Sequence, residues 1–563
     1  MTSLTVRVCA AFAGAAAACV SACASQNPPW EAVTTGRLIG ARGDDGWLMY
    51  RRTYDGRGHV PFTQIDSRNV GGLAVAFTYD TGLSPGHEGA PLVNGRYLVV
   101  TLPYDKVAAL DAVSGRLLWT FDPRVDQSML VHICCEAVNR GAAAFGDDVY
   151  VQTLDDRVIA LDGRSGGVVW SRQLAPAGIG YSMTGAPLVV DGAVVVGVGG
   201  GDFPVRGFLA ALDPHTGREL WRLQTIPGRG DRGGDTWPPQ GPRWGGATWQ
   251  TGTYDTATDT LFWGVGNPMP WRGDHRAGSN LYTDCLLAID PHTGRIKWYY
   301  QFTPHDFWDY DGTNEPVLVD LTIHGKRTRA IYQANRNGYF FLLDRITGKF
   351  LAATRFAAST AIAGYTSDGS ARINARAIPR PGAAPLVCPS TLGAKNWPPS
   401  TYDARTGLAY FGAIHACERV TVYPAPDRGT WTANGEMPVI GPEPGSPGYG
   451  EFEAVDVATG VKRWSVRSAL PWYDGALSTD SGLVFSGTAD GRFCAFDGRT
   501  GKLLWQYATA SGIIGVPVSY RVDGKQYVAV LSGWGGAVVH GGPLAAKLAV
   551  LPRGGRLYVF KLP

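Results

Sequence analysis

The sequence has little charge and few long apolar runs. Lys, Arg, Asp and Glu make up only 18% of the 563 residues, and their near balance leaves a formal net charge of +3. No run of Lys and Arg resembles the footprint of a nucleic-acid-binding surface, so we expect no nucleic-acid partner. After the first 24 residues, no apolar run is long enough to cross a bilayer as a helix. These shortages argue against a polyanion-binding protein and against an integral helical membrane protein.

The first 24 residues are typical of an export signal, with an Ala-rich apolar run from Val8 to Val20 that is too short to span a bilayer. Two cleavage sites compete. Ala22-Cys23-Ala24 suits an ordinary signal peptidase, whereas Val20-Ser21-Ala22-Cys23 resembles a bacterial lipobox, which would leave Cys23 lipidated. We therefore expect a periplasmic protein that is either free or tethered to the membrane through Cys23 alone.

Cysteine is scarce, and its spacing argues against two kinds of site. No pair of CxxC motifs with matching spacing occurs, so we do not expect zinc. No CxxCH motif occurs either, so this chain carries no covalent c-type haem of its own. An oxidising compartment would allow disulfides among the cysteines that follow the leader. These are Cys134, Cys135, Cys285, Cys388, Cys417 and Cys494.

What the sequence has in abundance is glycine (75) and tryptophan (18), arranged in short strands separated by tight turns. One pattern recurs, and its first copy runs from Val107 through Asp111 and Gly115 to Trp119. In such a hairpin the Asp side chain caps the turn, Gly takes the positive φ angle, and Trp packs against the neighbouring sheet. The Asp residues of the seven copies are Asp111, Asp162, Asp213, Asp290, Asp344, Asp456 and Asp497.

The spacing of these copies predicts a β-propeller. Most gaps between successive Asp residues are 41 to 54 residues long, which suits one four-stranded blade. The gap of 112 residues between Asp344 and Asp456 leaves room for a degenerate blade around Tyr402–Ala413. We therefore predict an all-β chain in which the signal peptide 1–24 precedes a single eight-bladed β-propeller at 25–563. The last strand, Leu557–Phe560, should join N-terminal strands and so remove an exposed edge.

The stretch Thr303–Gly312 interrupts the repeat and carries candidate chemistry. Asp309 and Asp311 stand two residues apart, a spacing that places both carboxylates on one side of an extended segment. Two carboxylates this close repel each other unless a proton or a metal ion lies between them. Their neighbours are aromatic, and desolvation makes an unpaired charge costly there. We predict a metal-and-base site in preference to a solvated pair of loop acids.

The adjacent cysteines Cys134 and Cys135 are a second candidate. The residues alone allow two interpretations, namely two buried free thiols or a disulfide between neighbours. A bond between neighbours closes a strained ring, and strain of that kind is retained mainly at functional sites. Export to an oxidising compartment favours the disulfide.

Together these motifs resemble a known family. The run Cys134-Cys135-Glu136-Ala137-Val138-Asn139-Arg140-Gly141, the Trp-terminated repeat, Gly266-Asn267-Pro268 and Trp308-Asp309-Tyr310 are similar to the pyrroloquinoline quinone (PQQ)-dependent alcohol dehydrogenases. Methanol dehydrogenase large subunits are the nearest type, and the resemblance extends from about Trp47 to the C-terminus. It implies an enzyme that oxidises an alcohol to an aldehyde with PQQ on the propeller axis. It also implies a separate cytochrome c-like protein that accepts the electrons.

The resemblance implies residue roles around PQQ. The adjacent cysteines match a disulfide on one face of the quinone, and Trp249 matches an indole on the other face. Cys388 and Cys417 match a structural disulfide. A tricarboxylate cofactor needs fixed guanidinium groups, which two of the matching residues would supply. The residues that match those binding the PQQ carboxylates and carbonyls are Glu88, Arg140, Thr184, Arg336 and Asn396.

The resemblance also implies one metal ion, held in the family by a Glu, an Asn and the catalytic Asp. Asn267 and Asp309 match the last two, whereas the Glu position is Asp202 here, which has a shorter reach. Asp311 stands where lanthanide-dependent members carry an extra carboxylate and calcium-dependent members carry a small residue. The metal ligands expected from the sequence are therefore Asp202, Asn267, Asp309 and Asp311.

Charge decides between the two kinds of ion. Three Asp side chains and one PQQ carboxylate over-neutralise Ca²⁺, and Coulomb attraction scales with ionic charge, so we favour a lanthanide with Ca²⁺ as the alternative. By the same resemblance, Asp309 is the general base that takes the alcohol proton, and Arg336 donates to the developing oxyanion.

Three other functions remain open from the sequence. The lipobox at Cys23 would suit a non-catalytic propeller lipoprotein that serves as an assembly scaffold. A PQQ-dependent sugar or polyol dehydrogenase would carry similar repeats. An enzyme relic is the third, if the change to Asp202 has abolished metal binding. The alcohol itself is not fixed by the sequence, although residues near Trp271, Phe307 and Trp472 are candidates for lining the substrate pocket.

Overall fold

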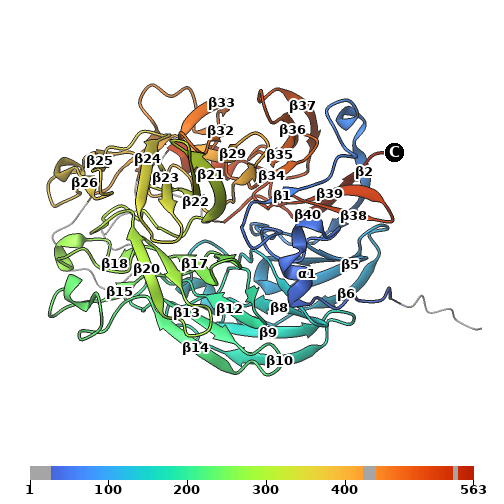
Figure 1. Ribbon diagram of the computed structural model, residues 1–563, viewed down its shortest axis with the longest axis horizontal. Coiled ribbons are helices and arrows are strands. Elements are labelled where there is room, and N and C mark those ends of the chain that lie inside the picture. Colours follow the sequence, from blue (N-terminus) through green and yellow to red (C-terminus); the bar gives the residue numbers. More distant parts are fainter. Residues whose placement is uncertain (1–26, 422–438, 537–542) are drawn as a thin grey trace, which may run out of the picture.

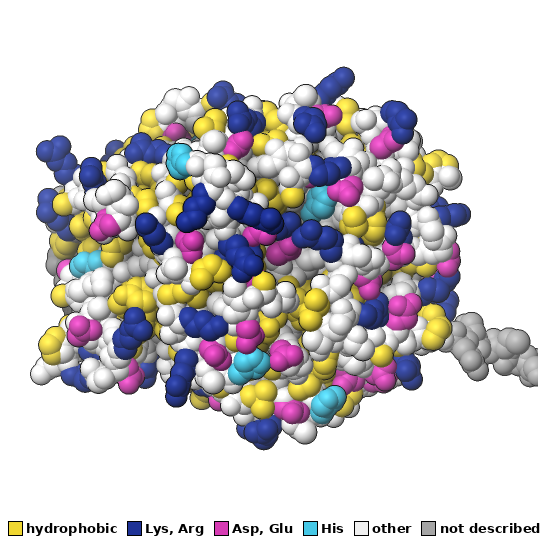
Figure 2. All heavy atoms as spheres, in the orientation of Figure 1, with side chains coloured by type: hydrophobic (Ala, Val, Ile, Leu, Met, Phe, Trp, Pro, Cys, Tyr) yellow, Lys and Arg dark blue, Asp and Glu magenta, His cyan; other side chains and the backbone are white. Residues whose placement is uncertain are grey.

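A computed structural model describes residues 27–421, 439–536 and 543–563 of the chain. The expected all-β class is confirmed, because the α-helices in these residues are only α1 (Thr35–Ile39) and α2 (Pro543–Ala549). None of the described helices is long and apolar enough to cross a membrane. The signal peptide expected at 1–24, with Cys23, lies outside the described residues. Basic and acidic side chains are interspersed on the face shown in Figure 2, as the low net charge leads one to expect.

Seven four-stranded sheets and one five-stranded sheet hold most of the described strands. Figure 1 shows these sheets following one another around the molecule in chain order. The first three are β3 (Leu92–Asn94), β4 (Tyr97–Thr101), β5 (Val107–Asp111) and β6 (Leu117–Phe121); β7 (Ala143–Phe145), β8 (Asp148–Gln152), β9 (Arg157–Asp162) and β10 (Val168–Gln173); and β11 (Leu188–Val190), β12 (Ala193–Gly197), β13 (Phe208–Leu212) and β14 (Glu219–Gln224).

The next two sheets contain the loops that reach the site described below. They are β16 (Thr253–Asp255), β17 (Thr260–Gly264), β19 (Cys285–Ile289) and β20 (Ile296–Gln301); and β21 (Val317–Ile323), β22 (Lys326–Ala334), β23 (Tyr339–Asp344) and β24 (Phe350–Arg355).

The last three sheets bring the two ends of the chain together. They are β28 (Thr401–Asp403), β29 (Leu408–Ile414), β32 (Gly450–Asp456) and β33 (Val461–Ser468); β34 (Ala476–Thr479), β35 (Leu483–Gly487), β36 (Arg492–Asp497) and β37 (Leu503–Ala508), which β1 (His59–Val60) joins; and β38 (Val518–Val522), β39 (Lys525–Ser532) and β40 (Arg556–Lys561), which β2 (Ala74–Asp80) joins.

Small sheets lie in the insertions between these larger ones. They are the pairs β15 (Trp244–Gly245) with β18 (Pro268–Met269) and β25 (Ile362–Tyr365) with β26 (Ala371–Ile373), and the trio β27 (Leu386–Val387), β30 (Ala416–Arg419) and β31 (Val439–Pro442).

The repeated hairpin behaves as its sequence predicts. Asp111 caps the turn, since its Oδ1 accepts hydrogen bonds from the backbone N–H of Ser114 at 2.8 Å and of Val113 at 3.2 Å. Trp119 donates from Nε1 to the carbonyl of Gly163, 3.0 Å away in the turn of the next copy. A Cβ atom on Gly166, which has φ +71°, would come within 2.5 Å of the Trp119 ring. Trp119 therefore docks one sheet onto the next, and its ring leaves room only for glycine at position 166.

Burial within a sheet follows the same logic. The third strands β5 and β13 are buried along their whole length, whereas the fourth strands β6 and β14 expose part of their residues. Apolar side chains of neighbouring sheets thus form the core between them, and the edges of the sheets face outward. Because the apolar side chains pack between the sheets, we expect the chemically active residues to lie in the connecting loops.

The two ends of the chain share one sheet. β2 pairs antiparallel with β40, with Val75 opposite Phe560 and Asp80 opposite Arg556, and β40 pairs with β39. The expected pairing of Leu557–Phe560 with an N-terminal strand is therefore confirmed.

The prediction of a degenerate blade around Tyr402–Ala413 is wrong. These residues form β28 and β29, which are the first two strands of the sheet that also contains the Asp456 repeat on β32 and β33. The eighth large sheet is instead the one made by β38, β39, β40 and β2. It has no Asp–Gly–Trp hairpin, because its outer strand comes from the other end of the chain, and this is why the repeat pattern did not reveal it.

Candidate active site

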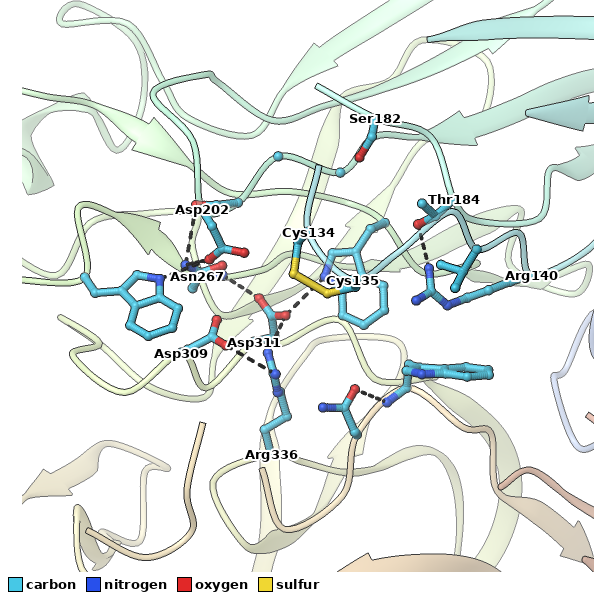
Figure 3. A pocket seen from close by; sticks show the side chains of 18 residues that line it. Cys134, Cys135, Arg140, Ser182, Thr184, Asp202, Asn267, Asp309, Asp311 and Arg336 are labelled. Carbon is cyan, nitrogen blue, oxygen red and sulfur yellow. Dashed lines mark hydrogen bonds and ion pairs between the residues drawn. A yellow bond between two sulfur atoms is a disulfide. The ribbon is translucent and has the colours of Figure 1, made fainter. Parts of the chain in front are cut away.

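Loops from several sheets meet in one pocket (Figure 3). Every residue expected from the sequence to bind PQQ or the metal ion lines it, except Glu88, which reaches the pocket through an ion pair with Arg140. The lining residues are Cys134, Cys135, Val138, Arg140, Ser182, Thr184, Gly199, Gly200, Gly201, Asp202, Trp249, Asn267, Trp271, Asp309, Asp311, Arg336, Asn396 and Trp397.

Arg336 lies at the centre of the acidic side of the pocket, in the turn that follows β22. Its Nη1 is 2.6 Å from Asp311 Oδ2, and its Nη2 is 3.3 Å from Asp309 Oδ2. Nη2 also donates to the carbonyl of Thr391 at 2.8 Å. Burial alone would lower the pKa of Arg336, but the carboxylates of Asp309 and Asp311 outweigh it and raise the pKa. This guanidinium therefore stays charged and holds both acids in place.

The segment that carries the two acids turns at Asp309 and is not the extended segment that the spacing suggested. Asp309 has φ +61°, in the left-handed region. Asp306 holds this turn, because its Oδ1 accepts from the backbone N–H of Trp308 and its Oδ2 from that of Tyr310, each at 3.0 Å. The carboxylates of Asp309 and Asp311 still converge on Arg336, through the turn. A capping role for Asp306 could have been read from its place just before an aromatic turn.

Asp202 and Asn267 complete the acidic side. The Asn267 amide nitrogen donates to Asp202 Oδ1 at 3.3 Å, and Trp271 Nε1 donates to the same oxygen at 3.0 Å. The backbone N–H of Asn267 donates to Asp311 Oδ1 at 2.7 Å. Hydrogen bonds and ion pairs thus connect the four residues expected to bind metal, from Asp202 through Asn267 and Asp311 to Arg336 and Asp309.

Burial makes this cluster costly to ionise. It raises the pKa of Asp202 to about 6, with a further contribution from the nearby Asp311 carboxylate. Burial also raises the pKa of Asp309 well above its usual range, although the Arg336 guanidinium opposes the change. Asp284 lies behind the cluster, and both of its carboxylate oxygens are buried without a hydrogen-bond partner among the described residues. Carboxylates outnumber positive groups here. The side-chain atoms that Asp202, Asn267, Asp309 and Asp311 could offer a metal ion are hard oxygens, which fits a cation such as Ca²⁺ or a lanthanide.

The opposite side of the pocket is built around Arg140. Its Nη2 is 2.7 Å from Glu88 Oε2, and its Nη1 donates to Thr184 Oγ1 at 2.5 Å. The guanidinium also lies 4.7 Å from the ring centroid of Trp249 and 4.9 Å from that of Trp397. Burial raises the pKa of Glu88 to about 7, against the lowering effect of Arg140. This side offers a planar aromatic surface, a cation and a hydroxyl group, which suits a flat anionic ligand.

The two expected disulfides are present. Cys134 is bonded to Cys135 at the pocket wall, and Cys388 is bonded to Cys417, which links β30 to the loop after β27. Cys285 and Cys494 are buried free thiols. Trp249 connects the two sides of the pocket, because its Nε1 donates to Asp311 Oδ2 at 3.1 Å while its ring contacts Arg140.

Some lining residues were missed and others were wrongly expected. Sequence reasoning overlooked Ser182 and Trp397, which could have been suspected from their closeness in sequence to Thr184 and Asn396. Trp271 lines the pocket as expected. The other two aromatic candidates, Phe307 and Trp472, do not line it; Phe307 packs against the rings of His305 and Trp308, and Trp472 stacks on Phe452.

Comparison with known proteins places the chain in a family. The profile of the glucose/ethanol/alcohol dehydrogenase β-propeller family, whose members use PQQ, matches residues 47–362 and 353–528. The chain therefore belongs to this PQQ-dependent dehydrogenase family, as the motifs predicted.

Curated relatives show which kind of dehydrogenase in this family the chain resembles. The chain is 36% identical over 542 residues to the quinoprotein alcohol dehydrogenase PedH of Pseudomonas putida, covering 90% of this chain and 89% of the relative. It is 36% identical over 583 residues to the quinohemoprotein alcohol dehydrogenase of Comamonas testosteroni, covering 98% and 80%. The solved structure of a europium-containing methanol dehydrogenase superposes with a TM-score of 0.88 at 33% identity, covering 94% of this chain and 100% of the other. The protein is a PQQ-dependent alcohol dehydrogenase.

Proposed function

We propose that this enzyme oxidises an alcohol to an aldehyde in the pocket between Arg336 and Arg140, with one lanthanide ion beside PQQ. The observation that carries the proposal is the convergence of Asp202, Asn267 and the Asp309–Asp311 pair on one side of a pocket whose other side holds Arg140. Neither a scaffold nor a relic needs such a buried excess of carboxylates, which destabilises a protein that binds no cation.

The residues on the Arg140 side would hold the cofactor. The Cys134–Cys135 disulfide and the Trp249 indole would contact its two faces, and Arg140, Thr184 and Asn396 would bind its carboxylates and carbonyls. Glu88 fixes the orientation of Arg140 through their ion pair. When bound, PQQ serves as the two-electron acceptor and the metal as the Lewis acid that polarises it.

The residues on the Arg336 side would hold the metal. Asp202, Asn267, Asp309 and Asp311 offer one oxygen or more each, and Asp311 supplies the additional negative charge that favours a trivalent ion over Ca²⁺. The similar methanol dehydrogenase whose structure is solved contains europium, a lanthanide, which supports this choice. Asp202 is hydrogen bonded by both Asn267 and Trp271, so its shorter side chain is already directed into the cluster.

Asp309 has the properties of the general base. Its carboxylate lines the pocket and is largely withdrawn from water, with 13% of the side chain exposed. Its only described charge partner is Arg336, at 3.3 Å, a contact that leaves lone pairs free to accept the hydroxyl proton of an alcohol. Arg336 keeps Asp309 oriented and offers a permanently charged donor to oxygen atoms in the pocket.

Several wider features belong to the same proposal. The eight large sheets would be the eight blades of one propeller spanning 25–563, with the pocket on its axis. The enzyme would act in the periplasm and pass electrons to a separate cytochrome c-like protein, a role supported by the quinohemoprotein relatives and by the absence of a CxxCH motif here.

The test is a dye-linked assay of protein reconstituted with PQQ and either CaCl₂ or LaCl₃, on a panel of primary alcohols, polyols and sugars. We expect turnover of primary alcohols that is much higher with La³⁺. Full activity with Ca²⁺ alone would overturn the lanthanide assignment, and a preference for sugars or polyols would make the enzyme a sugar or polyol dehydrogenase. An unchanged PQQ absorbance spectrum on addition of protein and metal would favour the scaffold.

A further inference from the structure

A second group of titratable side chains lies outside the active-site pocket, on the sheet that contains β29, β32 and β33. His415 lies between β29 and β30, Glu451 and Glu453 lie on β32, Glu443 follows β31, and Lys462 lies on β33. None of them lines the pocket that contains Arg336. The proposed alcohol oxidation therefore leaves this group without a role.

The spacing of three of these groups matches the ligands of one metal ion. His415 Nε2 is 3.0 Å from Glu451 Oε2 and 3.7 Å from Glu453 Oε1, and a ligand atom from each of the three residues lies within 4.8 Å of the others. Zinc bonds of about 2.0–2.2 Å in a tetrahedral site put neighbouring ligand atoms about 3.3–3.6 Å apart. The imidazole and the two carboxylates therefore need only small movements to share one ion.

The other nitrogen of the ring is held as it is in known metal sites. His415 Nδ1 is 2.9 Å from Glu443 Oε2. Without metal, both ring nitrogens contact carboxylates. Burial lowers the pKa of His415, but the hydrogen bonds to the three Glu side chains outweigh it and raise the pKa to about 11, so the ring is protonated. A metal ion would replace the proton on Nε2 while Glu443 keeps the Nδ1–H bond, the carboxylate–histidine arrangement typical of histidines that bind metal. Glu443 would thus orient the ligand without touching the metal.

A buried oxygen atom without a partner is an independent sign of a missing ligand. The side chain of Glu453 is fully buried and faces the cluster through Oε1, yet its Oε2 has no hydrogen-bond partner among the described residues. A carboxylate oxygen left this way is costly unless a cation compensates it. A metal ion bound by Glu453 would remove that cost.

In the metal-free protein the positive charge comes from the protonated His415 and from Lys462. Its Nζ is 2.7 Å from Glu451 Oε2 and 2.5 Å from Glu453 Oε1, close to where a shared ion would lie. Because 32% of its side chain is exposed, the ammonium group can move into solvent. With His415 neutral and Lys462 displaced, the carboxylates of Glu443, Glu451 and Glu453 outweigh the exposed Arg467, whose Nε is 3.7 Å from Glu451 Oε1. A cavity of about 450 Å³ beside the cluster has room for a water ligand and for the displaced side chain.

We propose that His415, Glu451 and Glu453 form a second metal site that takes a divalent transition-metal ion of the Zn²⁺ type, with Glu443 orienting His415. The cysteine spacing that argued against zinc does not bear on this site, because none of its ligands is a cysteine. Such an ion would fasten the residue before β30 to β32, and Glu443 would connect the residue after β31 to the same site. It would therefore stabilise the paired strands β30 and β31, the first of which carries Cys417, at a site separate from the catalytic metal.

The experiment is a calorimetric titration of Zn²⁺ into holoenzyme already loaded with PQQ and La³⁺. We expect one zinc equivalent per chain in the wild type and none in His415→Gln. Glu443→Gln should weaken binding about 10-fold, the usual effect of losing an outer-shell partner. Lys462→Met should tighten binding because it removes the competing ammonium group, and turnover of alcohol should be unchanged in all three variants.

Two controls keep the result decisive. Asp309→Asn should retain the zinc equivalent, which separates this site from the active site. When Co²⁺ replaces Zn²⁺, Lys462→Met should show the visible absorption of a histidine-ligated ion. This measurement does not depend on whether His415→Gln folds. Zinc uptake that persists in His415→Gln, or its absence in both the wild type and Lys462→Met, would overturn the proposal.

Discussion

The two arginines of the pocket have opposite surroundings. Arg336 faces two carboxylates, Asp309 and Asp311, whereas Arg140 faces one, Glu88, together with the hydroxyl group of Thr184. The first side therefore carries excess carboxylate charge that a proton or a bound cation must balance, and the second side is close to neutral. The difference indicates that the acidic side is built for a metal ion and the other for an organic anion.

The two sides also differ in what surrounds the charges. Two indole rings, those of Trp249 and Trp397, lie against Arg140, and they favour a flat ligand. Around Arg336 the neighbours are polar, and hydrogen bonds from Asn267 and Trp271 hold the carboxylate of Asp202. Variants on one side should therefore alter the binding of one ligand and leave the other largely unaffected.

The largest effect is expected from Asp309→Asn. The amide is isosteric but cannot accept the alcohol proton, so kcat should fall by about 10²–10⁴-fold, the usual contribution of a general base. PQQ should still bind, as followed by its absorbance. Turnover close to the wild-type value would remove Asp309 from the role of base.

Asp311→Ala tests the acidic side as a metal site. Loss of one carboxylate ligand should weaken La³⁺ binding by at least the roughly 10–100-fold that outer-shell changes cause, and activity supported by La³⁺ should fall before PQQ binding does. Metal affinity can be measured by competition with a chelator. Asp147→Ala, at an exposed carboxylate outside the pocket, is the matched control. Equal La³⁺ affinity in Asp311→Ala and the control would show that Asp311 is not a ligand.

Arg140→Met tests the opposite side. Charge-assisted hydrogen bonds contribute about 1.5–3 kcal/mol, so the affinity for PQQ should fall roughly 10–100-fold while La³⁺ affinity in the absence of PQQ stays the same. The variant leaves the Glu88 carboxyl buried without its partner, so the double variant with Glu88→Gln controls for lost stability. A fall in La³⁺ affinity in both variants would contradict the division of the pocket into two sides.

The smallest effect concerns the pH dependence of stability without cofactor and metal. The folded-state pKa of Asp202 is raised to about 6, above the usual value near 3.9, so the folded protein binds the extra proton between these values. Its contribution to stability is present below about pH 4 and is lost as the pH rises through 6. Asp202→Asn should remove this loss. Relative to wild type, its free energy of unfolding should rise by on the order of 1 kcal/mol between pH 4 and 7, a modest amount because residual solvent screens the charge. Urea unfolding at the two pH values measures it, and parallel profiles for the two proteins would contradict it.

The sequence predicted the parts of the fold that have a local signature. Each hairpin with Asp, Gly and Trp at fixed offsets appears where it was expected, because the turn at Asp111 and the docking of Trp119 need only residues of one copy and the next. The sheet of β38, β39, β40 and β2 lacks that signature, since its fourth strand is hundreds of residues distant in sequence. A long gap was therefore assigned a blade that it does not contain.

The site was predictable in membership but not in geometry. The family resemblance was enough to group Asp202, Asn267 and Asp309 in one site. The left-handed turn at Asp309 could not be read from a two-residue spacing, because it depends on Asp306 capping the backbone. Phe307 and Trp472 were wrongly expected in the pocket for a similar reason. Packing against other rings, such as that of Trp472 on Phe452, removes them from the pocket, and only long-range contacts decide this.

The pairing of β2 with β40 has a consequence for biosynthesis. Residues 74–80 are made early but find their neighbour only when residues 556–561 have emerged, so one sheet stays incomplete throughout translation. Until then β2 and β39 each present an open edge, which invites pairing with other chains. A stop codon before Arg556 would leave that edge permanently open, so shortened chains should aggregate even though every catalytic residue is intact.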